Sequence, residues 1–186
     1  MDNEPKTLKS QRTDKIALHK VSGFLLSREI ITASPEVDMN GADLLAIIKV
    51  QDGAKFARIQ CKGRTLTSLK SKTSIKIKKS YVTGTFTLLL YVHCPYDSTE
   101  HLFCFFAHDI KGRQELWKIT DSEYRLSLYG KTFGEKFDLF GFTESRVKAL
   151  KEMIEASDMD KEFYYVFGKV NGTESLDKVS IHVSSS

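Results

Sequence analysis

The chain lacks a long apolar run and has only three cysteines. No segment approaches the roughly 18 consecutive apolar residues that a membrane span needs. The first residues, Met1–Lys6, are polar and do not resemble the apolar core of a signal peptide. The cysteines show no C-x-x-C spacing, which argues against a disulfide framework. We therefore expect a cytoplasmic protein with no membrane partner.

The sequence also lacks the glycine-rich patterns of nucleotide-binding enzymes. It contains no Walker A loop, no dinucleotide-binding G-x-G-x-x-G and no G-x-S-x-G of a hydrolase nucleophile. Nucleotide-cofactor and serine-hydrolase chemistries therefore have no visible site. What remains is a chain of 186 residues, 41% hydrophobic and 28% charged, which is the composition of one globular domain.

Acidic residues are missing from one long stretch. Between Gly53 and Tyr96 there is no Asp or Glu, although the chain has 24 in total and a net charge of only +4. A local excess of positive charge is what a phosphate-backbone ligand requires. The alternative is a solvated strand face that pairs with acids from the rest of the chain. The cations of this stretch are Lys55, Arg58, Lys62, Arg64, Lys70, Lys72, Lys76, Lys78 and Lys79.

A carboxylate stands at the start of a predicted hairpin. Asp43 comes directly before an apolar run over residues 44–50. The turn residues Gln51-Asp52-Gly53 follow, and a second run covers residues 55–62. This order predicts two antiparallel strands, with Asp43 at the open end of the first and beside the far end of the second.

The second strand of this hairpin alternates in polarity near its end. Gln60 and Lys62 project from one face, whereas Ile59 and Cys61 project from the other. Burying an amide and an ammonium without partners is costly. We therefore expect a polar site where Asp43 meets Gln60 and Lys62.

This arrangement resembles the PD-(D/E)xK nuclease superfamily, which includes restriction enzymes, junction resolvases and a small group of homing endonucleases. In that pattern a carboxylate opens the second strand, and an acid precedes a lysine by two residues on the third. Asp43 matches the carboxylate and Lys62 the lysine, with Gln60 in place of the acid, as in Gln-x-Lys branches of the superfamily. The resemblance covers roughly residues 12–110.

The resemblance implies a restriction-endonuclease-like core of the α+β or α/β class. A central mixed β-sheet would be flanked by an N-terminal helix and by a later helix. Residues 1–11 would be a flexible tail, 12–157 the core domain and 158–186 a C-terminal extension packed on it. The implied activity is metal-dependent hydrolysis of DNA phosphodiester bonds. Symmetric cutting of both strands would need two sites, so a homo-oligomer is compatible with this activity.

The resemblance also implies a metal site. Mg²⁺ or Mn²⁺ would be held by Asp43, by Gln60 and by a backbone carbonyl near Cys61. The ion would activate a water, and Lys62 would position that water or stabilise the charge of the transition state. Because Gln60 is neutral, a catalytically impaired protein of this fold that binds DNA or a protein partner is the alternative. A phosphate-binding scaffold without a nucleic-acid role is a third interpretation.

A further acid is expected near this site, because the first helix of the superfamily often carries a Glu. Alignment of the helix end places His19 at that position. Glu36 and Asp38, in the loop that leads to Asp43, are the other candidates. For each of the three, the alternative is an ordinary solvated side chain.

A second lysine-rich strand is predicted over residues 74–82. Ile75 and Ile77 share one face, whereas Lys76 and Lys78 share the other. Lysines on a strand face either line a nucleic-acid groove or protect an edge strand from aggregation. The nucleic-acid-binding candidates are Arg64, Lys70, Lys72, Lys76 and Lys78.

Apolar spacing predicts the remaining elements. A helix should begin at Thr13, with Thr13 or Asp14 as its N-cap, and end by Ser34-Pro35. A second helix should run from a Thr143 cap to about residue 156. Residues 124–142, with glycines among aromatics, are expected to be irregular. Further strands are expected over 85–93, 102–107 and 117–119. Residues 163–167 and 178–183 are expected to form a terminal hairpin, with the alternative that 163–167 extends the preceding helix.

Overall fold

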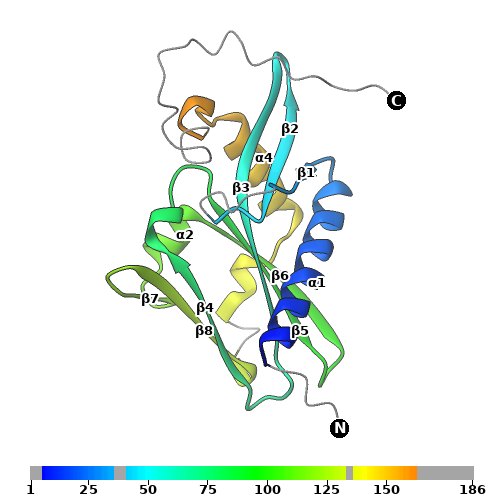
Figure 1. Ribbon diagram of the computed structural model, residues 1–186, viewed down its shortest axis with the longest axis vertical. Helices are drawn as coiled ribbons and strands as arrows, with labels where there is room; N and C mark the ends of the chain where they lie inside the picture. The colour runs from blue at the N-terminus through cyan, green and yellow to red at the C-terminus, as the bar shows by residue number, and fades with distance from the viewer. Residues whose placement is uncertain (1–5, 36–40, 133–135, 163–186) are drawn as a thin grey trace.

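The computed structural model describes residues 6–35, 41–132 and 136–162 (Figure 1). The helices are α1 (Lys6–Leu26), α2 (Ala107–Gly112) and α4 (Glu144–Glu155), with short 3-10 turns η1 (Lys79–Tyr81), η2 (Gly130–Thr132) and η3 (Asp138–Phe140). The strands are β1 (Ile31–Ala33), β2 (Leu44–Val50), β3 (Gly53–Thr65), β4 (Lys72–Lys78), β5 (Thr87–Cys94), β6 (Thr99–Phe106), β7 (Trp117–Ile119) and β8 (Glu123–Tyr129). They form two sheets, of order β1-β2-β3-β5-β6 and β4-β8-β7.

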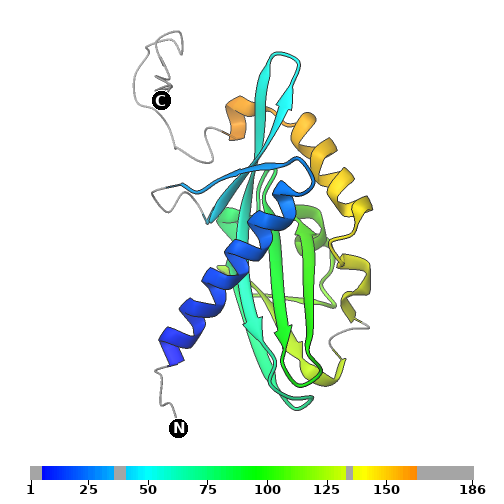
Figure 2. The same cartoon turned by 90° about the vertical axis from the view of Figure 1, so that its right-hand side faces the viewer.

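The five-stranded sheet is mixed. β2 pairs antiparallel with β3, β3 pairs parallel with β5, and β5 pairs antiparallel with β6. Helices α1 and α4 cover one face of it (Figure 2), where Val21, Leu25, Leu150 and Ile154 pack on residues such as Ile59. The expected central mixed sheet, flanked by an N-terminal helix and a later helix, is therefore confirmed. The class is α+β.

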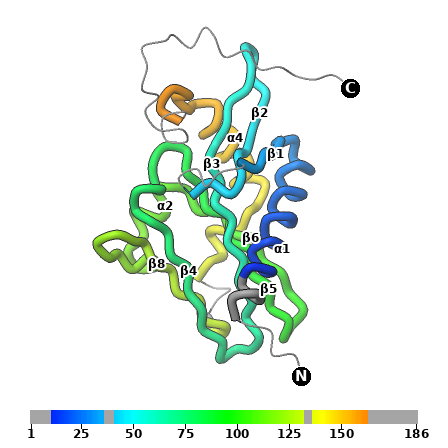
Figure 3. Tube along the Cα trace, viewed as in Figure 1, coloured from blue at the N-terminus to red at the C-terminus, as the bar shows by residue number. Residues whose placement is uncertain are grey.

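The three-stranded sheet packs on the opposite face. Ile77 of β4 and Leu126 of β8 are buried in the same cluster as Leu88 of β5. The Trp117 ring meets Phe105 edge to face, with the ring centroids 5.6 Å apart. The molecule thus has three layers, with the helices and the small sheet on opposite sides of the large one (Figure 3).

The predicted hairpin is present as expected. Gln51 and Asp52 form the turn, and Gly53 has a positive φ of 140°, which favours glycine. The register places Leu44 opposite Ile59. Asp43, the residue before β2, therefore lies beside the part of β3 that follows Ile59.

Helix α1 begins earlier and ends earlier than the apolar pattern predicted. It begins at Lys6. The prediction missed this start because the first two turns of the helix are polar and show no apolar stripe. It ends at Leu26 in a left-handed turn at Glu29, where φ is 61°. The Ile30 amide donates to the Leu25 carbonyl and closes this turn. The residues after it form β1 instead of a further helical turn.

The stretch 124–142, expected to be irregular, begins with a regular strand. β8 pairs with β4 along its whole length, with Lys72 opposite Tyr129. Leu126 and Leu128 point into the core, whereas Ser127 between them does not. The alternation is short, and the glycines that suggested irregular structure lie beyond it.

The later helix agrees with the sequence prediction. Thr143 occupies the N-cap position of α4, and Val147, Leu150 and Ile154 form its buried stripe. The predicted terminal hairpin, residues 163–167 and 178–183, lies outside the described residues. No helix in the described part of the chain is long and apolar enough to cross a membrane.

Candidate functional site

Strand β3 changes its neighbour at Ile59. Residues Gly53–Ile59 pair with β2, whereas Ile59–Thr65 pair with β5. After Ile59, the side of β3 that faced β2 has no strand neighbour among the described residues. Backbone amides on such an edge need other acceptors.

Two carboxylates supply those acceptors. Asp43 Oδ2 accepts a hydrogen bond from the Cys61 amide at 2.7 Å. Asp14 Oδ1, on helix α1, accepts one from the Gly63 amide at 2.9 Å. The Asp43 amide in turn donates to the Ile59 carbonyl at 2.8 Å. The two acids thus lie one after the other along the open edge of β3.

Gly63 allows helix α1 to come this close. A Cβ atom at Gly63 would overlap the backbone carbonyl of Thr13. The helix therefore lies directly on the backbone of β3, and only glycine fits there. This close approach brings Asp14, the next residue, to the strand edge.

The side chain of Gln60 is buried and only 6% exposed. Its Oε1 atom has no hydrogen-bond partner among the described residues. An unsatisfied buried acceptor costs roughly 1–3 kcal/mol, which sites of ligand or cation binding can recover. The partly exposed Lys62 follows on the same face of β3.

Asp43 meets β3 at the residue between Gln60 and Lys62. Within a strand, the amide and carbonyl of one residue point to the same edge. The Cys61 carbonyl therefore points to the edge that Asp43 and Asp14 occupy. The Cys61 thiol is buried on the opposite side of the strand from Gln60. Burial raises its pKa, with Asp43 as a further cause, so it remains a neutral core group.

The acid of α1 that reaches β3 is Asp14, whereas the expected position in the first helix was that of His19. His19 is exposed on α1, whereas Asp14 contacts β3 directly. Asp14, offered with Thr13 as a helix cap from the sequence, lies inside α1, and its contact with β3 was not predicted. The signal was present, because Asp14 precedes Leu18 and Val21 on the inward face of the helix. Glu36 and Asp38 lie outside the described residues.

The atoms along the open edge of β3 that could bind a metal ion are oxygen atoms. They are the carboxylates of Asp14 and Asp43 and the carbonyl of Cys61, with the amide oxygen of Gln60 on the adjoining face. Magnesium prefers oxygen ligands and keeps several waters, so one or two carboxylates suffice. Across residues 6–35, 41–132 and 136–162, no three His, Cys, Asp or Glu side chains form a metal-binding group. The two carboxylates, the Cys61 carbonyl and the Gln60 amide oxygen are ligand types that magnesium accepts.

Arg64 belongs to this edge but is engaged by the protein. Its Nη1 lies 3.4 Å from Asp14 Oδ1, and its Nε donates to the Ser74 carbonyl of β4 at 3.2 Å. Burial lowers the pKa of Arg64, and Asp14 partly opposes that shift. Arg64 therefore ties α1, β3 and β4 together, which restricts its expected role in nucleic-acid binding.

Arg58, which precedes Gln60 on the same face of β3, also has protein partners. Arg58 is fully buried and pairs with Glu162 at 3.3 Å. It also donates to the Thr83 hydroxyl at 3.1 Å, while Glu162 accepts from the Thr85 amide at 2.8 Å. This cation of the basic stretch is neutralised within the fold.

Tyr81 packs against Gly41, in the segment that leads into β2. The φ of Gly41 is +78°, and a Cβ there would overlap the Tyr81 ring. Lys78 Nζ lies 5.3 Å from the centroid of that ring. The end of β4 is thereby connected, through Tyr81, to the backbone two residues before Asp43.

The remaining nucleic-acid-binding candidates lie on the surface. Lys72, Lys76 and Lys78 are exposed on the outer face of β4, and Lys70 is exposed in the loop before it. Lys76 Nζ lies 3.4 Å from the carboxylate of Glu123. The alternation expected from the sequence is confirmed, whereas the ligand of these lysines stays a prediction.

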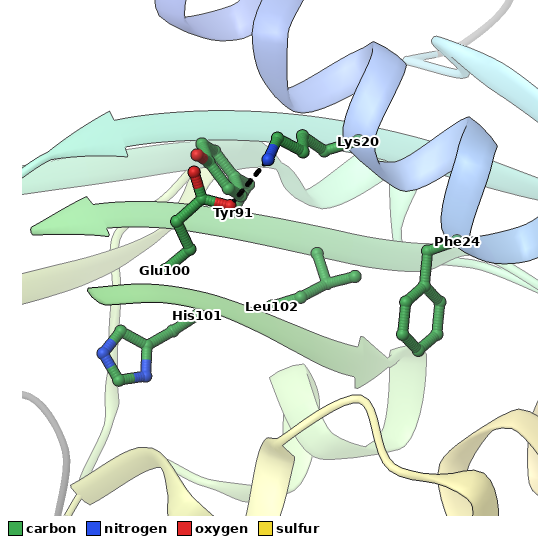
Figure 4. A pocket seen from close by; sticks show the side chains of 6 residues that line it. All are labelled: Lys20, Phe24, Tyr91, Glu100, His101 and Leu102. Atoms are coloured by element: carbon green, nitrogen blue, oxygen red, sulfur yellow. Dashed lines mark hydrogen bonds and ion pairs between the residues drawn. The ribbon is translucent and has the colours of Figure 1, made fainter. Parts of the chain in front are cut away.

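A separate pocket of about 170 Å³ lies between α1 and the β5-β6 hairpin (Figure 4). The Lys20–Glu100 ion pair, 2.8 Å long, closes one side of it. Burial and the neighbouring Glu100 raise the pKa of Tyr91 to about 12. The pocket takes no residue from β3, so it is not part of the candidate site. Its lining residues are Lys20, Phe24, Tyr91, Glu100, His101 and Leu102.

Comparisons of the chain with known protein families, with curated proteins and with solved structures find no match.

Proposed function

We propose that the protein is a metal-dependent nuclease with a restriction-endonuclease-like core, and that it hydrolyses DNA phosphodiester bonds at the open edge of β3. One observation carries the proposal. The Asp43 carboxylate binds the backbone between Gln60 and Lys62, and Asp14 from the first helix lies on the same edge. This is the order of elements that the superfamily resemblance implies.

In this proposal some residues of the site hold the metal ion, and Lys62 acts on the phosphate. Asp43, Asp14 and the Cys61 carbonyl would hold Mg²⁺ or Mn²⁺, with the Gln60 amide oxygen as a neutral ligand or acceptor for water. A divalent ion held there supplies Lewis acidity and lowers the pKa of its bound water. Lys62 is partly exposed beside them, so its ammonium can reach a phosphate oxygen and stabilise the charge that develops on it.

The alternative function is DNA binding without cleavage. It is favoured by the neutral Gln60 and by the existing partners of the two carboxylates. Asp14 already contacts Arg64 as well as the Gly63 amide, and Asp43 already accepts from Cys61. These contacts compete with a metal ion for the same oxygen atoms.

A plasmid-nicking assay tests the proposal. The full chain should nick supercoiled DNA with Mg²⁺ or Mn²⁺ and should stop when EDTA is added. Lys62→Ala and Asp43→Asn should each reduce the rate by about 100-fold or more, because each removes a charge that acts on the reacting phosphate or its metal. Lys49→Ala, at an exposed position of the β2-β3 hairpin, is the matched control and should cleave normally.

Gln60→Glu tests whether the side chain at position 60 contributes to the metal site. A third carboxylate at this position should lower the Mn²⁺ concentration that half-saturates binding, as measured by calorimetry. Cleavage that persists in EDTA, or that Lys62→Ala leaves unchanged, would refute the nuclease proposal. DNA binding without any metal-dependent cleavage would establish the alternative.

A further inference from the structure

The outer face of the small sheet carries a row of cations. The strand register places Lys76 of β4 opposite Arg125 of β8, and Arg125 opposite Lys118 of β7. All three project outward, because Ile75, Ile77, Leu126 and Trp117 on the same strands are buried in the core. Adjacent strands lie about 4.8 Å apart, so the row crosses the sheet within roughly 10 Å.

Two further lysines extend this face along β4. Lys72 lies opposite Tyr129, and its Nζ is 5.1 Å from the centroid of the tyrosine ring. Lys78 lies opposite Glu123, which is the single carboxylate among the outward positions of these three strands. We call this surface the cationic face; it comprises Lys72, Lys76, Lys78, Lys118 and Arg125.

The fold by itself does not favour such a row. Like charges directly opposite one another on neighbouring strands are destabilising. Glu123 lies 3.4 Å from Lys76 and 3.9 Å from Arg125, so one carboxylate offsets part of the repulsion. A bound polyanion would offset the rest, which is the electrostatic signature of a phosphate-binding surface.

The cationic face adjoins the candidate site. Arg64 connects Asp14 to the Ser74 carbonyl in the middle of β4. Lys78 and Tyr81 connect the end of β4 to Gly41, just before Asp43. The small sheet lies on the side of the molecule away from α1 (Figure 1). The contacts of Arg64 and Tyr81 nevertheless bring β4 close to the second half of β3 and to the residues before Asp43, so a long ligand that crosses the cationic face and continues past β4 would approach the open edge of β3.

We propose that the cationic face holds the phosphate backbone of duplex DNA next to the open edge of β3. This inference rests on the proposed function, which takes DNA as the substrate. The chemistry favours a duplex, because single-strand binding relies on several aromatic side chains that stack on successive bases. Tyr129, 42% exposed, is the sole aromatic among the outward positions of β4, β7 and β8.

The test is duplex binding in EDTA, measured by fluorescence anisotropy over a series of salt concentrations. Lys76→Ala with Lys118→Ala should weaken binding by about tenfold or more and reduce the slope of log K against log salt by about 2. Lys49→Ala with Lys148→Ala is the matched control. It removes the same charge, and Lys148 also has a carboxylate neighbour, Glu152, at 3.7 Å.

Glu123→Gln is the opposite variant. It removes the carboxylate from the cationic face, so it should tighten duplex binding and steepen the salt dependence. These substitutions are at solvent-facing positions, and unfolding curves should show that the variants remain folded. A labelled single strand of the same sequence should bind more weakly than the duplex.

Three results would overturn the inference. They are no duplex binding by the unmodified protein, equal weakening by the two double variants, and tighter binding of the single strand. Because EDTA prevents metal-dependent cleavage, these results do not depend on the catalytic proposal. A protein that binds duplex DNA through this face and never cleaves it would refute the nuclease proposal alone.

Discussion

The two halves of β3 use the same kind of residue for different purposes. One face of the strand carries a polar residue at every second position, namely Arg58, Gln60, Lys62 and Arg64. In the first half Arg58 is buried and neutralised by Glu162. In the second half the polar side chains stand beside an edge occupied by two carboxylates. The two halves carry similar polar residues, so the difference between them comes from the groups that surround each side chain.

The change of strand neighbour at Ile59 explains this difference. Each half of β3 has a neighbouring strand on one side only, either β2 or β5. The free amides of the second half are satisfied by Asp43 and Asp14, and this brings two negative charges to one line of backbone. A strand with partners on both sides along its whole length would leave no room for them.

The largest effect on stability is expected in the first half. Glu162→Ala removes the partner of a fully buried Arg58, so the free energy of unfolding should fall by roughly 3–5 kcal/mol. Urea denaturation measures this. The double variant Arg58→Met with Glu162→Met should be closer to the unmodified protein, because no charge remains buried. A loss below about 1 kcal/mol for Glu162→Ala would show that Arg58 is solvated in the folded state.

A smaller effect is expected where α1 lies on the second half. Gly63→Ala introduces a methyl group against the Thr13 carbonyl, so the helix must shift, at a cost of about 1–3 kcal/mol in unfolding free energy. Cleavage should also fall, because Asp14 moves with the helix. Thermal and urea unfolding, together with the nicking assay, check both expectations.

Gly23→Ala is the matched control on the same helix. Apart from the adjacent residues and the backbone of the helix itself, no atom lies within 4 Å of the added methyl group, so the substitution should stabilise the protein by up to about 1 kcal/mol through helix propensity. If both glycine variants changed stability equally, the close approach of α1 to β3 would not be the cause.

The smallest effect is expected at the carboxylates themselves. Asp14→Ala leaves the Gly63 amide without its acceptor and should reduce the free energy of unfolding by about 1 kcal/mol. Asp14→Asn should reduce it less, because its amide oxygen can still accept that hydrogen bond. Hydrogen exchange of the Gly63 amide is the direct measurement. Equal protection in the alanine variant would contradict the assigned bond.

Local patterns predicted the strand part of the site well. The turn residues and the apolar run after Asp43 were enough to place the hairpin, and the alternation from Ile59 to Lys62 was enough to assign the faces. These features depend on neighbours a few residues apart. β8 was missed because its alternation is brief, and Asp14 because a lone acid near a helix start has the same pattern as a cap.

The sequence by itself determined the hairpin, the polar face of β3 and the outward lysines of β4, because turn chemistry and period-2 alternation are encoded in adjacent residues. Only the tertiary structure decided which acid joins Asp43, which arginine is neutralised, and which cations of β7 and β8 line up with Lys76. Those outcomes depend on how closely a helix or a strand can approach another backbone. Contacts at Gly63 and between β4 and β8 join residues far apart in the chain, where no local pattern records them.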